Sequence, residues 1–267
     1  MDIMKKEDNI SISAVIITKN EENKIKKCLD SLKNLVNEII IIDDLSYDNT
    51  VKICKEYGAK VIVNESKGNF DRQRNLGIEN ATGDWILQMD ADEIVTEEAK
   101  EKIKEAIKDP KDFVAFKLKR LNFFFDHPLR YGGVYDYQIK LFKKGYAYYI
   151  GESIHETLKV DGKIGSIDAD VLHYPYFSLN TFINKLNFYT DIETEQFLKD
   201  KQKISFKEIK YRLTWKALKL FWKLYIKKKG YKDGMYGLIW AIINVIGPEI
   251  RWLKIWEKAL KEGKLES

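Results

Sequence analysis

The sequence predicts an α/β fold with a mostly parallel, wound sheet and a helical extension at the C-terminus. Three observations support this prediction. Short apolar segments alternate with segments of helical periodicity through the first 95 residues. Apolar residues occupy both faces of the segment 38–43, as is typical of a strand that helices cover on both sides. From Leu179 onward the periodicity is only helical.

The elements of the first half follow one another in a regular order. Strands are expected over residues 13–18, 38–43, 60–63 and from Trp85 to the acidic residues beginning at Asp90. Helices are expected between these strands, over residues 23–35, 49–57 and 71–80, and a further helix near Thr96. Ser46 or Asp48 can cap the second helix, and Gly58 can end it as a left-handed C-cap. This repeated strand–helix–strand order implies a parallel, right-handed wound sheet.

The second half of the chain changes character twice. Residues 113–150 alternate apolar and polar side chains in short pieces, which predicts strands of a mixed sheet. Beyond them, Gly and Pro at residues 230–234 and 247–248 are typical of helix breaks. Helices are therefore expected over residues 210–229, 235–246 and 251–261. We divide the chain into a domain over residues 1–177 and a helical region over residues 178–267.

The composition is that of an ordinary globular protein. Of the 267 residues, 45% are hydrophobic and 33% are charged, which allows a substantial core. The two cysteines, Cys28 and Cys54, occupy apolar positions of predicted helices and are expected to be buried, reduced thiols. Residues 1–8 are too charged for a signal peptide, and the longest apolar run, residues 237–247, is too short to span a bilayer. The chain is therefore expected to be cytoplasmic, either soluble or bound to a surface.

Charge is distributed unevenly along the chain. Residues 201–267 hold 17 Lys and Arg against 6 Asp and Glu, whereas the whole chain has a net charge of only +5. Lysines in residues 210–229 are interleaved with Trp, Tyr, Phe and Leu, which is typical of a helix lying on an anionic bilayer. The alternative is that these helices pack on the rest of the protein and expose only their lysines. Nucleic acid is not an expected partner, because no recognised binding motif accompanies the charge.

Polar and acidic residues gather where three of the predicted strands end. They are Thr18, Lys19, Asn20, Glu21 and Glu22 after the first strand, Asp43, Asp44, Ser46 and Asp48 after the second, and Asp90, Asp92 and Glu93 after the fourth. In a parallel sheet these ends share one edge, which is where open α/β sheets bind ligands. Carboxylates that converge repel one another unless a cation or a donor-rich ligand lies between them.

The pair Asp90 and Asp92 offers closely spaced oxygen ligands. Such ligands favour Mg²⁺ or Mn²⁺ shared with a substrate diphosphate. The alternative is a solvated acidic turn that caps the helix near Thr96. Two common nucleotide sites are excluded, because no Gly-x-Gly-x-x-Gly follows the first strand and no Gly-x₄-Gly-Lys-Ser/Thr occurs in the chain.

Four segments of the first half resemble family 2 glycosyltransferases of the GT-A fold. They are residues 13–22 (SAVIITKNEE), 41–50 (IIDDLSYDNT), 72–75 (RQRN) and 84–93 (DWILQMDADE). Their order and spacing are most similar to the lipopolysaccharide-core β-1,4-glucosyltransferase branch, which residues 154–156 and 173–174 also resemble. The resemblance implies a GT-A catalytic domain over residues 1–177. Residues 1–95 would be its nucleotide-sugar-binding half and residues 96–177 its acceptor and catalytic half.

The resemblance implies which residues hold the nucleoside. Residues after the first strand would line the nucleoside end of the donor pocket, namely Thr18, Asn20 and Glu22. Asp43 or Asp44 would accept a hydrogen bond from the base, which the resemblance implies to be uracil. Leu45 stands where many members have Gly, so the turn after the two aspartates is expected to differ from theirs.

The resemblance also assigns the diphosphate and the metal. Arg74, together with Arg72, would face the diphosphate or the donor sugar, and the alternative is a solvated helix face. Asp90 would hold the ribose or a metal-bound water, and Asp92 would ligate a divalent Mn²⁺ or Mg²⁺ directly. His173 is a further candidate ligand, against the alternative of a structural histidine.

The general base is expected in the second half of the domain, because the acceptor hydroxyl must lose its proton there. We predict Glu156 as this base and His155 as a contact to the sugar or the metal. Glu152 and Asp136 are reserve candidates. Lys140 stands where this branch often has Arg, so the forked phosphate contact that Arg makes is not expected at that position.

The sequence therefore predicts a metal-dependent, inverting glycosyltransferase. It would move a hexose from a nucleotide sugar, UDP-linked by resemblance, to a glycolipid, lipopolysaccharide or polysaccharide acceptor. It would work peripherally on the inner face of the cell membrane. One alternative is nucleotidyl transfer, which would require a Gly- and Lys-rich phosphate loop after the first strand, where residues 18–22 are acidic instead. Another alternative is a catalytically silent scaffold that binds a nucleotide sugar or a membrane. The oligomeric state is left open.

Overall fold

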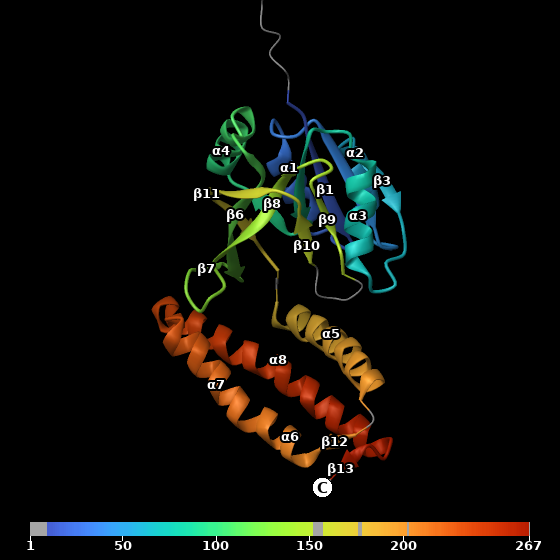
Figure 1. Ribbon diagram of the computed structural model, residues 1–267, viewed down its shortest axis with the longest axis vertical. Coiled ribbons are helices and arrows are strands. Elements are labelled where there is room, and N and C mark those ends of the chain that lie inside the picture. The colour runs from blue at the N-terminus through green and yellow to red at the C-terminus, as the bar shows by residue number, and fades with distance from the viewer. Residues whose placement is uncertain (1–9, 152–156, 176–177, 202, 267) are drawn as a thin grey trace, which may run out of the picture. The chain divides into compact units, whose positions relative to one another are not determined.

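The computed structural model of the protein describes residues 10–151, 157–175, 178–201 and 203–266. It divides into two units, each with its own hydrophobic core (Figure 1). The sheet unit consists of Met1–Arg120 and Asp136–His173, and the helical unit consists of Leu121–Tyr135 and Tyr174–Ser267.

The main sheet has the strand order β3-β2-β1-β4-β8-β6-β11-β5. Its strands are β1 Ile12–Thr18, β2 Glu38–Asp43, β3 Lys60–Val63, β4 Trp85–Asp90, β5 Glu93–Val95, β6 Phe113–Phe124, β8 Asp136–Lys143 and β11 Lys163–His173. The pairs β1–β2, β1–β4 and β2–β3 are parallel, whereas β4–β8, β6–β8 and β5–β11 are antiparallel. The predicted wound α/β fold is confirmed, and its antiparallel extension makes the sheet mixed.

Helices cover both faces of the parallel strands, as side-chain alternation along a buried strand requires. The helices are α1 Ile25–Leu32, α2 Thr50–Glu56, α3 Phe70–Asn80 and α4 Glu97–Lys108. Ile16 of β1 shares a core with α1, α2 and α4, whereas its neighbour Val15 shares the opposite core with Ile78 of α3. The short strands β9 Ala147–Tyr149 and β10 Leu158–Val160 contribute to the α3 side.

Gly77 brings α3 unusually close to the sheet. A Cβ atom at this position would lie 2.3 Å from Cγ1 of Val15, so no larger residue fits without movement. The start of the same helix is fixed by Asn69, whose side chain accepts a hydrogen bond from the backbone N–H of Arg72. The close approach and the cap together determine where Arg74, one turn before Gly77, meets the end of β4.

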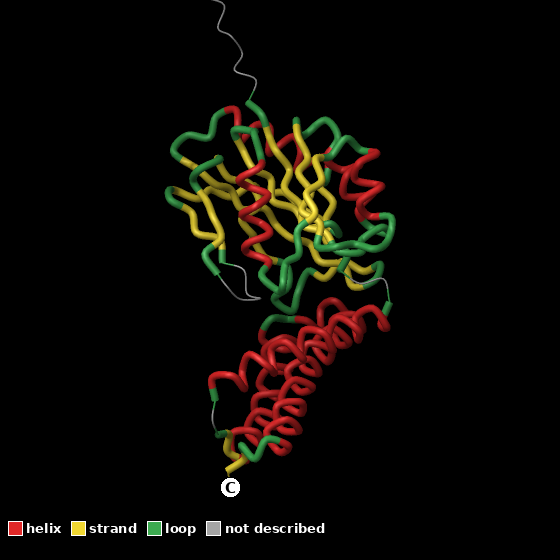
Figure 2. Tube along the Cα trace, turned by 90° about the vertical axis from the view of Figure 1, so that its right-hand side faces the viewer, coloured by secondary structure: helices red, strands yellow, loops and turns green. Residues whose placement is uncertain are grey.

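The helical unit is built around two long helices, α5 Leu179–Asp200 and α8 Gly234–Lys261 (Figure 2). A continuous helical segment lies between them in the chain, formed by α6 Phe206–Tyr211, a π-helical turn Arg212–Lys216, α7 Ala217–Phe221 and a second π-helical turn Trp222–Lys227. A 3₁₀ turn, Gly230–Asp233, leads into α8. The short strands β12 Ile204–Ser205 and β13 Leu265–Glu266 pair in parallel beside the core of Leu198, Trp252 and Ile255.

The predicted helix break at residues 247–248 is wrong, because α8 continues through Pro248. Pro lacks the backbone N–H that would bond the preceding turn, which costs about 3 kcal/mol in a helix interior. Contacts along α5 offset this cost. Ion pairs join Arg251 to Glu193 at 2.7 Å and Lys254 to Asp191 at 2.6 Å, and Trp252 is buried.

The division predicted at residue 177 also differs from the structure. The segment Leu121–Tyr135, which includes β7 His127–Leu129, groups with the C-terminal helices. The backbone N–H of Tyr131 donates to Asp233 at 2.9 Å, and that of Gly132 donates to the carbonyl oxygen of Lys228 at 2.9 Å. Such contacts join residues about 100 positions apart and leave no trace in local periodicity.

Candidate active site

The polar residues predicted to meet at the carboxyl edge of the sheet do lie together. In the parallel register, Thr18 of β1 lies opposite Asp43 of β2, and Ile17 of β1 lies opposite Asp90 of β4. The hydroxyl of Thr18 donates to Oδ1 of Asp43 at 2.9 Å. The strand ends therefore form one continuous polar rim.

Asp43 and Asp44 are held by the turn that follows β2. Asp43 accepts hydrogen bonds from the Ser46 backbone N–H at 2.9 Å and the Ser46 hydroxyl at 2.6 Å. Asp44 accepts from the N–H and hydroxyl of Ser66, both at 2.8 Å, and pairs with Lys19 Nζ at 2.9 Å. Burial alone would raise the pKa of Asp44, but the hydrogen bonds from Ser66 and Lys19 outweigh it and lower that pKa. Both carboxylates are thus fixed in place by partners.

Leu45 adopts the left-handed conformation with φ of 55°. This conformation is costly for a residue with a Cβ and suits Gly, the residue that the resemblance implies for this position. Leu45 therefore takes a backbone conformation that a glycine would adopt at lower cost. The hydrogen bonds that Ser46 gives to Asp43 help to hold it.

Asn20 and Glu22 tie the loop after β1 to the loop after β2. Asn20 accepts from the Tyr47 N–H at 3.0 Å, and its own N–H donates to the Ser46 hydroxyl at 2.8 Å. Glu22 accepts from both the backbone N–H and the side-chain amide of Asn49, at 3.0 and 2.9 Å. These two predicted nucleoside contacts therefore already have a structural role.

A charge cluster surrounds the end of β4. Arg74 Nη2 lies 2.8 Å from Asp90 Oδ1, and Arg120 Nη2 lies 3.2 Å from Asp90 Oδ2. Glu93, which has no exposed surface, contacts Lys140 Nζ at 2.7 Å and Arg120 Nε at 2.9 Å. Glu93 also accepts a hydrogen bond from the backbone N–H of Asp90 at 2.9 Å. Two carboxylates are thereby balanced by three cations that come from α3, β6 and β8.

Asp90 remains ionised within this cluster. Burial alone would raise its pKa, but the positive charges of Lys140, Arg74 and Arg120 hold the pKa of Asp90 well below its ordinary value. Arg74 contacts one oxygen of Asp90 and Arg120 contacts the other.

Asp92 faces a different set of groups. Its Oδ1 lies 3.4 Å from Nε2 of His173, and its Oδ2 lies 3.5 Å from Nζ of Lys24. Burial alone would raise the pKa of Asp92, but the hydrogen bond and charge of His173, together with the charge of Lys24, lower it. A carboxylate and an imidazole at this separation are a donor pair that suits a divalent cation such as Mn²⁺. Among the residues that the structure describes, no third His, Cys, Asp or Glu side chain completes a metal-binding group with them.

The remaining predicted residues are distributed unevenly. Arg74 is buried and lies over the ring of Tyr149 at 5.6 Å, whereas Arg72 is exposed, so the structure separates the two arginines. Asp136 is exposed at the start of β8, opposite Arg120. The predicted base and its neighbours lie outside the described residues, namely Glu152, His155 and Glu156.

Sequence reasoning missed several members of this site. Arg120 and Lys24 were given no role, Lys140 was noted only as a departure from Arg, and Glu93 only as a further acid. A signal for Glu93 does exist in the sequence. A buried strand followed by three acids within four residues requires compensating cations, although their positions cannot be read from local spacing.

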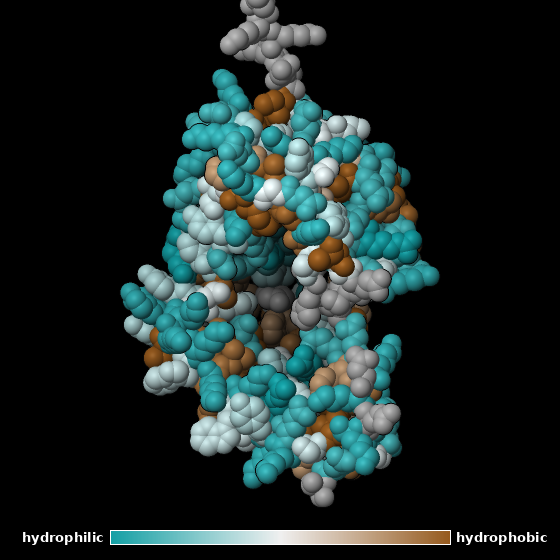
Figure 3. All heavy atoms as spheres, in the orientation of Figure 1, coloured by the Kyte–Doolittle hydropathy of each residue, from teal (hydrophilic) through white to brown (hydrophobic). Residues whose placement is uncertain are grey.

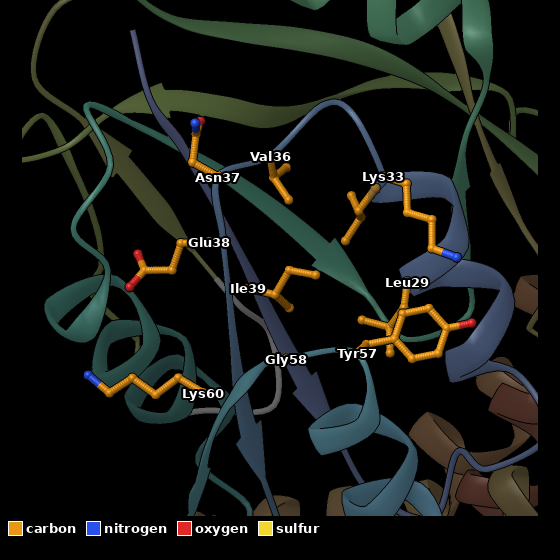
Figure 4. A pocket seen from close by; sticks show the side chains of 10 residues that line it. Leu29, Lys33, Val36, Asn37, Glu38, Ile39, Tyr57, Gly58 and Lys60 are labelled. Atoms are coloured by element: carbon orange, nitrogen blue, oxygen red, sulfur yellow. The ribbon is translucent and has the colours of Figure 1, made fainter. Parts of the chain in front are cut away.

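A hollow of about 430 Å³ lies elsewhere on the sheet unit (Figure 4). Its walls include Leu29, Tyr57 and Ile39, so it lies at the amino end of β2, whereas Asp43 lies at the carboxyl end. None of the acids and cations of the rim lines it. We therefore assign the chemistry to the rim and not to this hollow.

Comparison with known proteins gives a consistent result. Residues 13–154 match the family model described as glycosyl transferase family 2. A Rickettsia typhi protein named as a glycosyltransferase is 30% identical over 262 residues, covering 94% of this chain and 88% of the relative. LpsC, a lipopolysaccharide core biosynthesis glycosyltransferase of Rhizobium meliloti, is 24% identical over 94% of this chain and 94% of its own. The solved structure of S. aureus TarS 1–349 aligns over 95% of this chain and 92% of that chain, with 15% identity and a TM-score of 0.49.

Replacing Glu93 by Gln should destabilise the sheet unit. Lys140 and Arg120 would keep their charges without the carboxylate that balances them, and removing one partner of a buried ion pair costs about 3 kcal/mol or more. Urea denaturation would measure this loss in the free energy of unfolding. Glu101→Gln is the matched control, because that exposed carboxylate pairs with the exposed Lys104 at the surface and should matter little. Equal stability of the two variants would show that Glu93 does not set the charge balance.

Proposed function

The chain belongs to glycosyltransferase family 2, and from that premise we propose that it moves a hexose from a UDP-linked sugar to a glycolipid, lipopolysaccharide or polysaccharide acceptor, with inversion. The observation that carries this proposal is the convergence of Asp44, Asp92 and Arg74 on one rim of the sheet, each with defined partners. A nucleoside would need a hydrogen-bond acceptor, which Asp44 offers. A diphosphate would need a cation, which Arg74 offers, and a metal would need a carboxylate, which Asp92 offers.

For the nucleoside end we propose Thr18, Asn20 and Glu22, with Asp43 or Asp44 as the acceptor for the base. Asp44 is the better placed of the two aspartates. Its partner Lys19 has a side chain that is 58% exposed and can swing away to admit a ligand. The partners of Asp43 are the buried Thr18 hydroxyl and the backbone N–H and hydroxyl of Ser46 in its own turn.

For the diphosphate end we propose that Asp92 and His173 hold Mn²⁺ or Mg²⁺, with Asp90 beside them. A divalent cation bound there would stabilise the negative charge that builds on the departing diphosphate. Arg74 and Lys24 bring further positive charge to the same place, since each contacts one of the aspartates. Asp90 keeps Arg74 oriented through the 2.8 Å contact, so its proposed role includes positioning as well as binding. The exposed Arg72 is left as an outer contact to the donor.

For the acceptor we propose Glu156 as the general base, which takes the proton of the attacking hydroxyl, with His155 as a sugar or metal contact. An inverting transfer needs one displacement only, so no covalent link between sugar and enzyme is required. Glu152 and Asp136 remain the reserve bases. LpsC is named for lipopolysaccharide core biosynthesis, which supports an acceptor of the cell envelope. Such acceptors are built on lipids, so we further propose that the enzyme works peripherally at the inner face of the membrane.

A thermal-shift titration would test the donor site. UDP, GDP, dTDP and CDP would each be added with and without Mn²⁺. A ligand at about 100 times its dissociation constant stabilises the native state by roughly 2.7 kcal/mol. We expect a Mn²⁺-dependent shift with UDP that is lost in Asp92→Asn and kept in Asp112→Asn, a change at an exposed surface carboxylate. Absence of a shift with every nucleotide would favour a scaffold without donor binding.

Replacing Glu156 by Gln should lower the rate of transfer about 10²- to 10⁴-fold, as expected for the loss of a general base. The thermal shift with UDP and Mn²⁺ should be unchanged, because donor binding does not use this carboxylate. Asp136→Asn is the parallel variant and should keep most of the activity. A near-normal rate of sugar transfer in Glu156→Gln would exclude Glu156 as the base. A loss of transfer activity in Asp136→Asn would assign the role of base to Asp136.

Replacing Lys24 by Met should tighten metal binding. The Lys24 ammonium lies 3.5 Å from Asp92 Oδ2 and competes there with a divalent cation for the carboxylate. We expect the affinity for Mn²⁺ without nucleotide to rise roughly tenfold, equivalent to ~1.4 kcal/mol, in isothermal titration calorimetry. Lys27→Met, at an exposed position of α1, controls for the change in net charge. Unchanged or weaker Mn²⁺ binding in Lys24→Met would contradict the competition.

A further inference from the structure

A row of large apolar side chains lies exposed along the helical segment between α5 and α8. The row, here called the aromatic row, consists of Tyr211, Trp215, Leu218, Trp222 and Ile226. Trp215 and Leu218 are each 64% exposed and Trp222 is 62% exposed. Single exposed apolar residues are normal on a protein surface, but a contiguous row of this kind marks an interaction site.

The aromatic row is not needed to hold the segment in the helical unit. The opposite side of the same helix carries Ile209, which is buried, and Leu213, which packs against the core of Leu198, Trp252 and Ile255. Leu213 is two positions from both Tyr211 and Trp215, which places it about 200° around a helix from each. The helix therefore buries one side in its own unit and exposes the aromatic row on the other side.

Lysines accompany the aromatic row. Lys216, Lys219, Lys223 and Lys227 each directly follow one of its members, so they lie about 100° around the helix from it. All four are exposed, and none of them forms an ion pair with a carboxylate within the part of the chain that the structure describes. Glu208, the one acid in residues 206–227, is engaged by Lys201 at 3.2 Å and Arg212 at 3.3 Å. The row is thus flanked by uncompensated positive charge.

We propose that the aromatic row is a docking face for an anionic lipid bilayer. Trp and Tyr settle at the boundary between headgroups and acyl chains, and neighbouring lysines gain from anionic headgroups. Figure 3 shows hydrophilic and more hydrophobic side chains next to one another on the visible face of the helical unit. Among the described residues, no helix is long and apolar enough to cross a membrane, which agrees with attachment at the surface.

Charge complementarity favours a bilayer over a second copy of the chain. A symmetric contact through the aromatic row would bring the lysines of one copy against those of the other, which is repulsive. The docking face rests on the proposed function in one respect. The partner that it names, a bilayer, is the one that would carry the lipid-linked acceptor of the proposed function.

Vesicle co-sedimentation of the full chain would test the docking face. The probes are vesicles of phosphatidylcholine alone and of phosphatidylcholine mixed with phosphatidylglycerol. We expect the wild-type protein to bind the mixed vesicles far better, and high salt to weaken binding because it screens the lysines. Lys219→Gln with Lys223→Gln should lower the partition coefficient about thirtyfold.

Trp215→Ala with Trp222→Ala should lower partitioning at least about tenfold, because it removes the interfacial anchors. Tyr146→Ala with Tyr148→Ala is the matched control, since it removes two exposed aromatic rings of the sheet unit and should leave binding unchanged. Retention of the far-ultraviolet circular dichroism and of the UDP thermal shift would show that the variants are folded.

Three results would overturn the docking face. They are no binding of the wild type to mixed vesicles, equal binding by the double Trp variant, and a dimer in analytical ultracentrifugation that the double Trp variant abolishes. Donor binding without vesicle binding would overturn this inference alone. Vesicle binding without any nucleotide shift would overturn the proposed function alone.

Discussion

Glu93 has no exposed surface, yet it contacts Lys140, lies beside Arg120 and accepts a hydrogen bond from the backbone of Asp90. A buried carboxylate is tolerated only when cations and donors surround it. Because its partners come from strands that are distant in the chain, Glu93 joins the parallel and the antiparallel parts of the sheet. The position of Asp90, and through it that of Arg74, depends on this one carboxylate.

The rest of the rim follows the same principle of local compensation. Each aspartate has its own partners, with Ser46 for Asp43, Ser66 and Lys19 for Asp44, and His173 and Lys24 for Asp92. These partners lower the pKa of Asp44 and of Asp92. A rim of this kind is organised before a ligand arrives, so little of the binding energy is needed to order it.

The sequence was most informative where structure is local. Strands β1 to β4 and helices α1 to α3 were predicted because each is a short run with its own periodicity and end signals. The contacts of Arg120 and Lys140 with the acids after β4 were not predicted, because they arise from antiparallel pairing through β8 and β6. The continuation of α8 through Pro248 was missed for a similar reason, since packing on α5 outweighs a local signal. The convergence of polar residues at the rim followed from topology alone, whereas the different partners of Asp90 and Asp92 did not.

The two π-helical turns have a geometric consequence for the aromatic row. Its members are separated by four, three, four and four residues, which averages slightly more than the 3.6 residues of an α-helical turn. On a regular α-helix such a row would wind slowly around the axis. The turns Arg212–Lys216 and Trp222–Lys227 hold more residues per turn than an α-helix does. The direction in which successive members of the row point therefore differs from that on a regular α-helix of the same sequence.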